Sequence, residues 1–314
     1  MLARLLSAMA RHAMLLLPCA LILGLAFQGL AAAMKPLITP FVVALLGIAM
    51  ARTDLPVFRG VARRPWLPLA MVAVAMIGIP CATAPLLDML PLSPGLKLAL
   101  ALMACLPPLT SMPAVAGFLG LDRARALFVT LAGTALMPLT VPPLALALLG
   151  LDIRIPFVDF MLRLASLVAA GLPLAVAIRS IVGEQRRQRA APVIDGLAVL
   201  ILLLFAIPIM DGVLGHIERT PWRTAGFVLS AFVATVLYMT VTMLAFWPAG
   251  RVLACTAAYA AGSRNNALLL AVLPATVDPD YFLFIAAVQF PIYLTPTLSR
   301  PVFRWLLRRQ PPPS

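Results

Sequence analysis

Ten apolar stretches divide the chain, and each has about the length that lets a helix cross the ~30 Å hydrocarbon core of a bilayer. Short polar or basic turns separate these stretches and leave no room for an extramembrane domain. The pattern predicts an all-α polytopic membrane protein in which residues 1–314 form a single membrane domain. The ten expected transmembrane helices are Ala13–Ala33, Pro36–Ala51, Trp66–Leu87, Leu98–Leu119, Ala126–Leu149, Phe157–Ile181, Val193–Val213, Gly226–Trp247, Val252–Val272 and Tyr281–Phe303.

The fourth expected helix cannot be continuous, because Pro107, Pro108 and Pro113 interrupt its middle. Broken backbone at this depth survives only where protein or a water-filled cavity satisfies it. Thr110 and Ser111 are then expected to cap a new half-helix that has Pro113 in its first turn. A simple proline kink is the alternative.

The ninth expected helix carries a polar segment, Gly262–Asn266, between apolar flanks. It includes Arg264, and a charged side chain at bilayer depth is costly enough that it is rarely kept without a partner or a task. Arg264 is therefore a candidate site residue, with a second half-helix beginning near Asn265. Alternatively, Arg264 snorkels to a lipid headgroup or pairs with a buried acid, and only fixes helix packing.

The two breaks fall at corresponding positions of two five-helix halves, residues 1–152 and 153–314. Because five is odd, the second half enters the membrane with the opposite orientation, as in inverted-repeat secondary transporters. Both new half-helices would point their N-terminal N–H groups at the bilayer midplane. Together with Arg264 they would form an anion-binding centre.

Composition and charge distribution support a membrane protein and indicate its orientation. The chain is 63% hydrophobic and 11% charged, with a mean hydropathy of +1.04, which excludes a conventional soluble core. If the ten helices alternate, the side of the N-terminus carries seventeen Lys and Arg residues and the other side six, with Arg264 between them. This bias predicts cytoplasmic termini and a place in the cell inner membrane. The net charge of +13 is thus a topology signal, and no nucleic-acid partner is expected.

Catalytic chemistry is not indicated. The two histidines, His12 and His216, lie near expected helix ends on opposite sides, and no HExxH motif or paired-carboxylate motif is present. The four cysteines fall inside expected helices without a CxxC spacing, so packing is their expected role. We therefore expect no enzyme, no metal centre and no cofactor.

With these motifs in place, the chain resembles the bile acid:sodium symporter superfamily, as a divergent bacterial member. The resemblance runs from Met34-Lys35-Pro36 onwards, and is most specific at the proline-containing break, the Leu121-Asp122-Arg123 turn and Arg264-Asn265. It implies that the fourth and ninth helices cross at their unwound points within a core. The first, second, sixth and seventh helices would form a panel that moves against this core, with substrate at the interface.

The chain departs from that family where sodium is bound. Sodium-using members carry a Pro-Gly-Gly-Thr-Ala-Ser-Asn-like break, whose Ser and Asn correspond to Met112 and Pro113 here. An acidic ligand corresponds to Ala260, and a glutamine to Arg264. A liganding serine corresponds to Ala126, while Asn265 and Thr130 are kept. Thr134 lies one turn beyond Thr130 on the same helix face. Either threonine hydroxyl could instead form a hydrogen bond with the backbone of the preceding helical turn. A hard cation needs several oxygen ligands, so we expect Arg264 to replace sodium as the local positive charge.

The sequence therefore predicts a secondary active transporter of a small organic anion, working by alternating access and independent of sodium. The expected substrate-binding residues are Arg264, Asn265, Asn266, Ser263, Thr110, Ser111 and Gln289, and the residual ion-binding candidates are Thr130, Thr134 and Asn265. Three alternatives stay open: a sodium-coupled symporter of bile acids or other organic acids, a metalloid efflux permease with Cys105 as thiol ligand, and a membrane sensor that does not transport.

Overall fold

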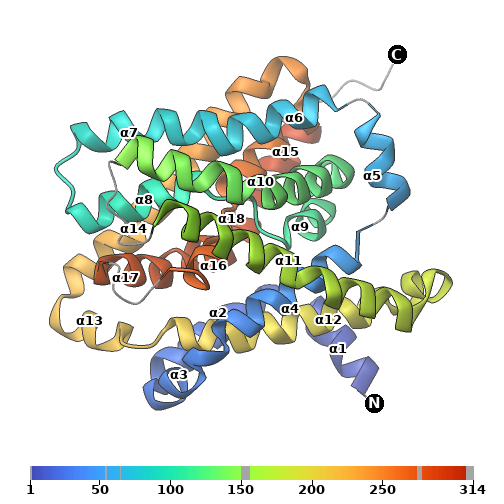
Figure 1. The fold of residues 1–314 in the computed structure, drawn as a ribbon, viewed down its shortest axis with the longest axis horizontal. Coiled ribbons are helices and arrows are strands. Elements are labelled where there is room, and N and C mark those ends of the chain that lie inside the picture. The colour runs from blue at the N-terminus through green and yellow to red at the C-terminus, as the bar shows by residue number, and fades with distance from the viewer. Residues whose placement is uncertain (1, 54, 64, 150–155, 274–277, 309–314) are drawn as a thin grey trace.

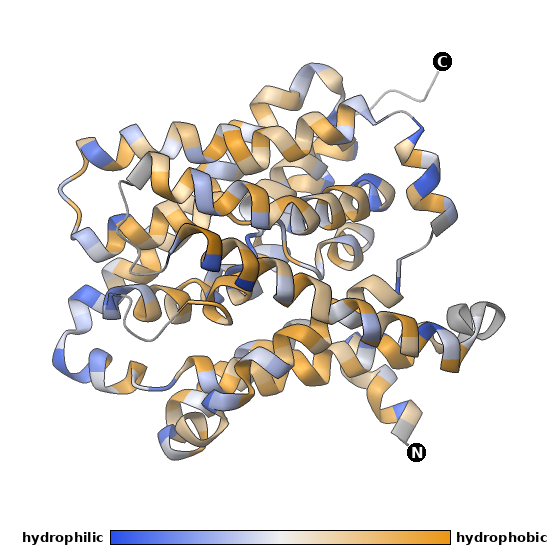
Figure 2. Ribbon diagram, in the orientation of Figure 1, coloured by the Kyte–Doolittle hydropathy of each residue, from blue (hydrophilic) through white to orange (hydrophobic). Residues whose placement is uncertain are grey.

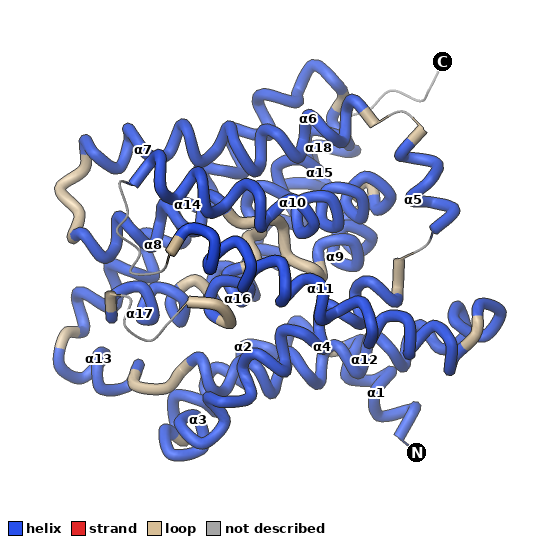
Figure 3. Tube along the Cα trace, in the orientation of Figure 1, coloured by secondary structure: helices blue, strands red, loops and turns tan. Residues whose placement is uncertain are grey.

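The computed structural model describes residues 2–53, 55–63, 65–149, 156–273 and 278–308, and nearly all of these residues are helical (Figures 1 and 3). Hydrophobic residues cover most of every long helix (Figure 2). The structure thus agrees with the expected all-α polytopic class. Among the described residues seven helices are long and apolar enough to cross a membrane, against the ten expected: Gln28–Ala51, Trp66–Met89, Arg123–Ala147, Phe157–Val182, Ala190–Ile209, Pro221–Ala249 and Pro279–Arg308.

The fourth and ninth expected helices are each present as two shorter helices. The fourth consists of α8 (Pro94–Cys105) and α9 (Met112–Leu119), and the ninth of α15 (Arg251–Gly262) and α16 (Asn266–Leu270). Both interruptions are therefore confirmed as real breaks of the helix rather than kinks. The expected boundary between the two halves, at residues 152 and 153, lies outside the described residues.

The N-terminal region differs from the expectation of one helix over Ala13–Ala33 and a turn at Lys35-Pro36. The chain forms α1 (Leu2–Arg11) and α2 (Ala13–Ala26), breaks at Phe27, and then runs without a turn through α3 (Gln28–Met34), the 3₁₀ segment η1 (Lys35–Leu37) and α4 (Ile38–Ala51).

The side chain of Gln28 explains why α2 ends where it does. Its Nε2 donates to the carbonyl oxygens of Gly24 and Leu25, both at 3.0 Å, and to that of Met210 at 3.1 Å. These bonds supply donors to carbonyls that the last turn of a helix leaves unsatisfied. Pro36 needs no turn, because it lies in the first residues of a helical segment, where a missing N–H is tolerated.

The helices pack in two layers (Figure 1). One layer, which we call the N-terminal layer, contains α1 to α4 with α11 (Phe157–Val182) and α12 (Glu184–Ile209). The other, which we call the crossing layer, holds both broken helices. Its further members are α5 (Leu55–Ala62), α6 (Trp66–Ala73), the π-helical turn η2 (Val74–Gly78), α7 (Ile79–Met89), α10 (Arg123–Leu149), α14 (Pro221–Phe246), the 3₁₀ segment η3 (Trp247–Ala249), α17 (Pro279–Ala287) and α18 (Gln289–Arg308); α13 (Val213–Arg219) leads into this layer from α12.

Glycines let helices of the N-terminal layer approach closely. A Cβ atom added to Gly47 of α4 would lie 2.6 Å from Cδ2 of Leu174 in α11. One added to Gly24 of α2 would lie 2.7 Å from the carbonyl oxygen of Ile207 in α12. Real Cβ atoms do not come so close to other heavy atoms, so the helices of this layer can pack at this distance only because these two positions are glycine.

Ion pairs join helix ends that the charge pattern assigns to the same side. On the expected outer side, Lys35 binds Asp211 at 2.9 Å, and both carboxylate oxygens of Asp280 accept from Nη2 of Arg223, at 2.7 and 2.6 Å. Arg52, at the opposite end, pairs with Asp195. The packing of the helices is therefore compatible with the alternation used to infer orientation.

Replacing Gly24 with alanine should destabilise the protein, because the new methyl group would press on the backbone of Ile207. Gly29, at the start of α3, is the matched control, since a Cβ there meets nothing within 4 Å. In a helix, alanine is otherwise favoured over glycine by roughly 0.5–1 kcal/mol. Thermal unfolding in detergent should show a lower melting temperature for Gly24→Ala and an equal or higher one for Gly29→Ala; equal behaviour of the two would contradict the close packing.

Asp280→Asn should lower the free energy of unfolding by about 1–2 kcal/mol, because it breaks the ion pair between the half-exposed guanidinium of Arg223 and a carboxylate that is largely buried. Asp280 is only 8% exposed and also accepts a hydrogen bond from Ser93. Asp211→Asn is the control, with an expected loss below about 1 kcal/mol, since its partner Lys35 is 61% exposed. Thermal unfolding of the two variants checks this order, and the reverse order would refute it.

Candidate functional site

The two breaks cross and bind each other through the backbone. Leu109 N donates to the carbonyl of Ser263 at 2.8 Å, and Asn265 N donates to the carbonyl of Pro107 at 2.9 Å. Pro108 and Arg264 therefore face each other as an antiparallel bridge. Each broken segment supplies the hydrogen-bond partners that the other lost when its helix unwound, which is how irregular backbone is tolerated at membrane depth.

Arg264 is completely buried at this crossing, with 0% exposure. Its Nη1 donates to two carbonyl oxygens, that of Ala75 at 2.8 Å and that of Leu106 at 2.7 Å. This geometry rules out the alternative in which Arg264 snorkels to a headgroup. The side chain joins the π-helical turn η2 to the end of α8.

Both carbonyls lack a helical donor for the same reason. In η2, the N–H of Ile79 reaches back to Val74 rather than to Ala75, and the next residue, Pro80, has no N–H to offer. Pro107 and Pro108 likewise stop α8 just after Leu106. Prolines on two different helices thus create two acceptors, and one guanidinium nitrogen satisfies both.

The rest of the guanidinium has no hydrogen-bond partner. Nε and Nη2 of Arg264 are buried and unpaired, and the cation lies 5.6 Å from the ring centroid of Tyr238. Within the part of the chain that the structure describes, no carboxylate pairs with Arg264. The charge is thus held by carbonyl dipoles and an aromatic face. Nε and Nη2 form the edge through which arginine binds a carboxylate with two parallel bonds.

The other polar residues of the ninth helix gather beside Arg264. Ser263, Asn265 and Asn266 are 5%, 5% and 1% exposed. Nδ2 of Asn266 donates to the carbonyl oxygen of Arg264 at 3.2 Å, which helps to hold the broken segment in shape.

The expected half-helices begin where the sequence indicated, at Met112 and Asn266, with Ser111 and Asn265 in the capping positions. Neither capping side chain bonds the helix it precedes. Thr110 and Ser111 are only partly buried, so their hydroxyl groups are the most accessible polar groups at the crossing. The five-residue α16 is too short to provide a strong N-terminal dipole.

The hydroxyl groups of the two threonines predicted to bind an ion do not form a set of oxygen ligands. Oγ1 of Thr130 lies 3.6 Å from Sδ of Met112, and Oγ1 of Thr134 bonds back to the carbonyl of Thr130 at 2.8 Å. A soft thioether therefore stands next to the retained threonine, and sulfur is a poor ligand for a hard cation.

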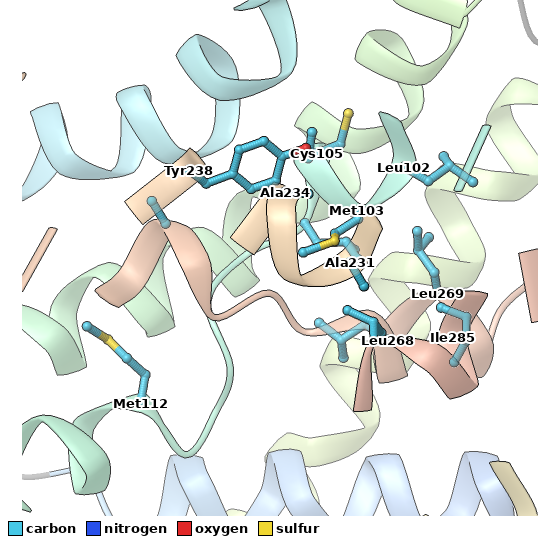
Figure 4. Close-up of a cluster of buried hydrophobic side chains, with 14 of the residues drawn as sticks. Leu102, Met103, Cys105, Met112, Ala231, Ala234, Tyr238, Leu268, Leu269 and Ile285 are labelled. Atoms are coloured by element: carbon cyan, nitrogen blue, oxygen red, sulfur yellow. The ribbon is translucent and has the colours of Figure 1, made fainter. Parts of the chain in front are cut away.

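One residue that the sequence assigned to the substrate site does not contact Arg264, and three residues that do contact it were not predicted. Gln289, the first residue of α18, is buried, but its Nε2 donates to the carbonyl oxygen of Ile285 in the preceding helix, α17. Ala75, Leu106 and Tyr238 were not anticipated, although Pro80 was the available signal for a carbonyl without a donor. Figure 4 shows buried apolar side chains that α8, α14, α16 and α17 contribute to the core, among them Leu102, Met103, Ala231, Leu268, Leu269 and Ile285.

The fold and the site define an all-α membrane protein in which two broken helices cross at a buried cation. Comparison of the chain with protein-family models and with curated proteins gave no match. The resemblance to the bile acid:sodium symporter superfamily therefore stays a prediction from the sequence motifs.

Arg264→Met should destabilise the protein less when Pro80 is also replaced with alanine. An alanine at that position would restore an N–H to α7 and give the Ala75 carbonyl an intrahelical donor, so about 1 kcal/mol of the loss should be recovered. A double-mutant cycle measured by thermal unfolding gives this coupling. Pro85→Ala is the matched control, because it alters another proline of α7 that bears on neither acceptor of Arg264. Additive losses in both cycles would show that the Ala75 carbonyl does not depend on Arg264.

Proposed function

We propose that this protein is a secondary transporter that binds a small organic anion at Arg264 and moves it across the membrane by alternating access. The carrying observation is the free edge of a buried guanidinium: Nε and Nη2 have no partner, while Nη1 is fixed by two carbonyls. A buried cation without a counter-ion is expensive. An anionic substrate would supply the missing charge and the two missing acceptors.

The substrate class follows from the shape of this edge. Two parallel N–H groups suit a carboxylate or a sulfonate, which offers two oxygens at matching spacing. Asn265, Asn266 and Ser263 line the same crossing, and the partly buried Thr110 and Ser111 are placed to orient the remainder of the molecule.

Access to Arg264 requires a conformational change, because the side chain is sealed in this conformation, and we infer from the resemblance that the two layers move against each other. Two hydrogen bonds connect the layers at the end of α16: Oγ1 of Thr39 donates to Ala271 O at 3.3 Å, and Nη1 of Arg163 donates to Val272 O at 3.5 Å. Both are long, and so they are weak contacts to break. In this proposal the N-terminal layer acts as the panel and the crossing layer as the core.

Arg264 would also replace sodium in this protein. Met112 occupies a position where the resemblance implies a sodium-binding serine, and its sulfur contacts Thr130. Ala126 and Ala260, which replace two other implied ligands, are buried and carry no oxygen on their side chains. Binding should therefore be independent of sodium. The same resemblance and the positive-inside bias support a place in the cell inner membrane with both termini in the cytoplasm.

Arg264→Lys should abolish the stabilisation of the protein by its substrate while leaving a folded protein. Lysine keeps the charge but not the bidentate edge. We would screen small carboxylates and sulfonates by thermal unfolding of purified protein, in sodium and in potassium buffer. A ligand at one hundred times its dissociation constant adds about 2.7 kcal/mol to stability, which corresponds to a rise of several degrees.

Arg179→Lys is the matched control. Arg179 is partly buried and, like Arg264, donates from one nitrogen to two carbonyls, those of Met50 at 3.2 Å and Thr53 at 2.6 Å, but it belongs to the N-terminal layer. This variant should lose stability and keep the full response to the anion. Stabilisation that requires sodium and survives Arg264→Lys would show an ordinary sodium symporter with its ligands elsewhere. Counterflow of the identified anion in proteoliposomes then separates a transporter from a sensor.

A further inference from the structure

An open hollow of about 600 Å³ lies between the end of α9 and the last turns of α18, away from the crossing. None of its lining residues belongs to the site around Arg264. Two glycines, three apolar residues and two arginines line it: Gly117, Gly120, Phe118, Leu119, Leu307, Arg304 and Arg308.

Glycine shapes the wall that α9 contributes. Gly120 ends α9 in the left-handed conformation, at φ 74°, which side chains other than glycine rarely adopt. A Cβ at this position would lie 3.8 Å from Cδ1 of Leu307. Because Gly117 and Gly120 have no side chains, the space between α9 and the arginines of α18 stays open.

The two arginines make the hollow strongly cationic. Arg304 and Arg308 are one helical turn apart and exposed. Among the described residues neither forms an ion pair, whereas Arg52, Arg125 and Arg223 all do. An exposed pair of guanidinium groups beside a hollow suits a phosphate, which arginine can bind through two parallel bonds.

An apolar surface leads along α18 towards these arginines. Leu294, Leu298, Val302 and Trp305 recur at spacings of three and four residues, so they share one helix face, and their exposures are 38%, 59%, 51% and 53%. Phe118, in the wall of the hollow, is 65% exposed. Such a face suits acyl chains, and tryptophan next to basic residues is typical of the level of the lipid headgroups.

We propose that this hollow binds the phosphate of an anionic phospholipid from the cytoplasmic leaflet. Arg304 and Arg308 would hold the phosphate, while acyl chains lie on the apolar face of α18 beside Phe118. The choice of leaflet depends on the orientation inferred from the basic residues, and the site does not depend on the transport proposal. The exposed apolar residues of α18 and Phe118 favour a lipid over a free phosphate ion, which would use only the two arginines.

Native mass spectrometry of the full-length protein in a neutral detergent tests this site. Phosphatidylglycerol, phosphatidylcholine and glycerol phosphate would be titrated against wild type, against the double variant Arg304→Gln/Arg308→Gln, and against Arg59→Gln/Arg63→Gln. The last loses the same charge from exposed positions outside the hollow. We expect the first double variant to weaken phosphatidylglycerol binding on the order of tenfold, and the second by less than about twofold.

Three outcomes would overturn the proposal. An equal loss in both double variants would mean diffuse attraction rather than a site. Equal affinity for phosphatidylcholine would show that the anionic headgroup is not recognised. Binding of glycerol phosphate as tight as that of the lipid would indicate a free anion site.

Phe118→Asn provides an arm that keeps both arginines: it should weaken phosphatidylglycerol binding and leave glycerol phosphate binding unchanged.

Discussion

The structure depends on one nitrogen atom, Nη1 of Arg264, and the two carbonyls to which it donates. Backbone carbonyls at membrane depth must be satisfied within the protein, because no water is present to replace a lost donor. Pro80 removes the donor for Ala75, and Pro107 and Pro108 end α8 at Leu106. A cation shared between these acceptors is a stable solution to two defects that would each be costly alone.

This solution also holds an uncompensated charge in the middle of the protein. Guanidinium geometry divides the side chain into an edge that the fold uses and an edge that it leaves free. The bonds of Nη1 fix the direction in which Nε and Nη2 point. The structural role of Arg264 is therefore compatible with the proposed binding role, since fixing one edge of the guanidinium would pre-organise the other and reduce the entropy lost on binding.

Much of the architecture could be predicted from the sequence, because the constraints are local. Apolar stretches of spanning length, three prolines within one of them and a polar segment within another specify the helices and their breaks, and the structure has half-helices that begin at Met112 and Asn266. The prediction of one continuous helix over Ala13–Ala33 was wrong, because the break at Phe27 depends on a contact with a residue far away in the sequence. The side chain of Gln28 caps α2 and bonds to Met210. Tyr238 and Ala75 are close to Arg264 only through packing, so spacing along the chain could not reveal them.

The antiparallel bridge between Pro108 and Arg264 has an evolutionary consequence. Backbone atoms of Pro107, Leu109, Ser263 and Asn265 hold the two breaks together. Side chains at the crossing other than that of Arg264 can therefore be exchanged without breaking these backbone hydrogen bonds. If the crossing binds a substrate as proposed, related chains that share this backbone joint could change their substrate through few side-chain substitutions while the fold stays intact.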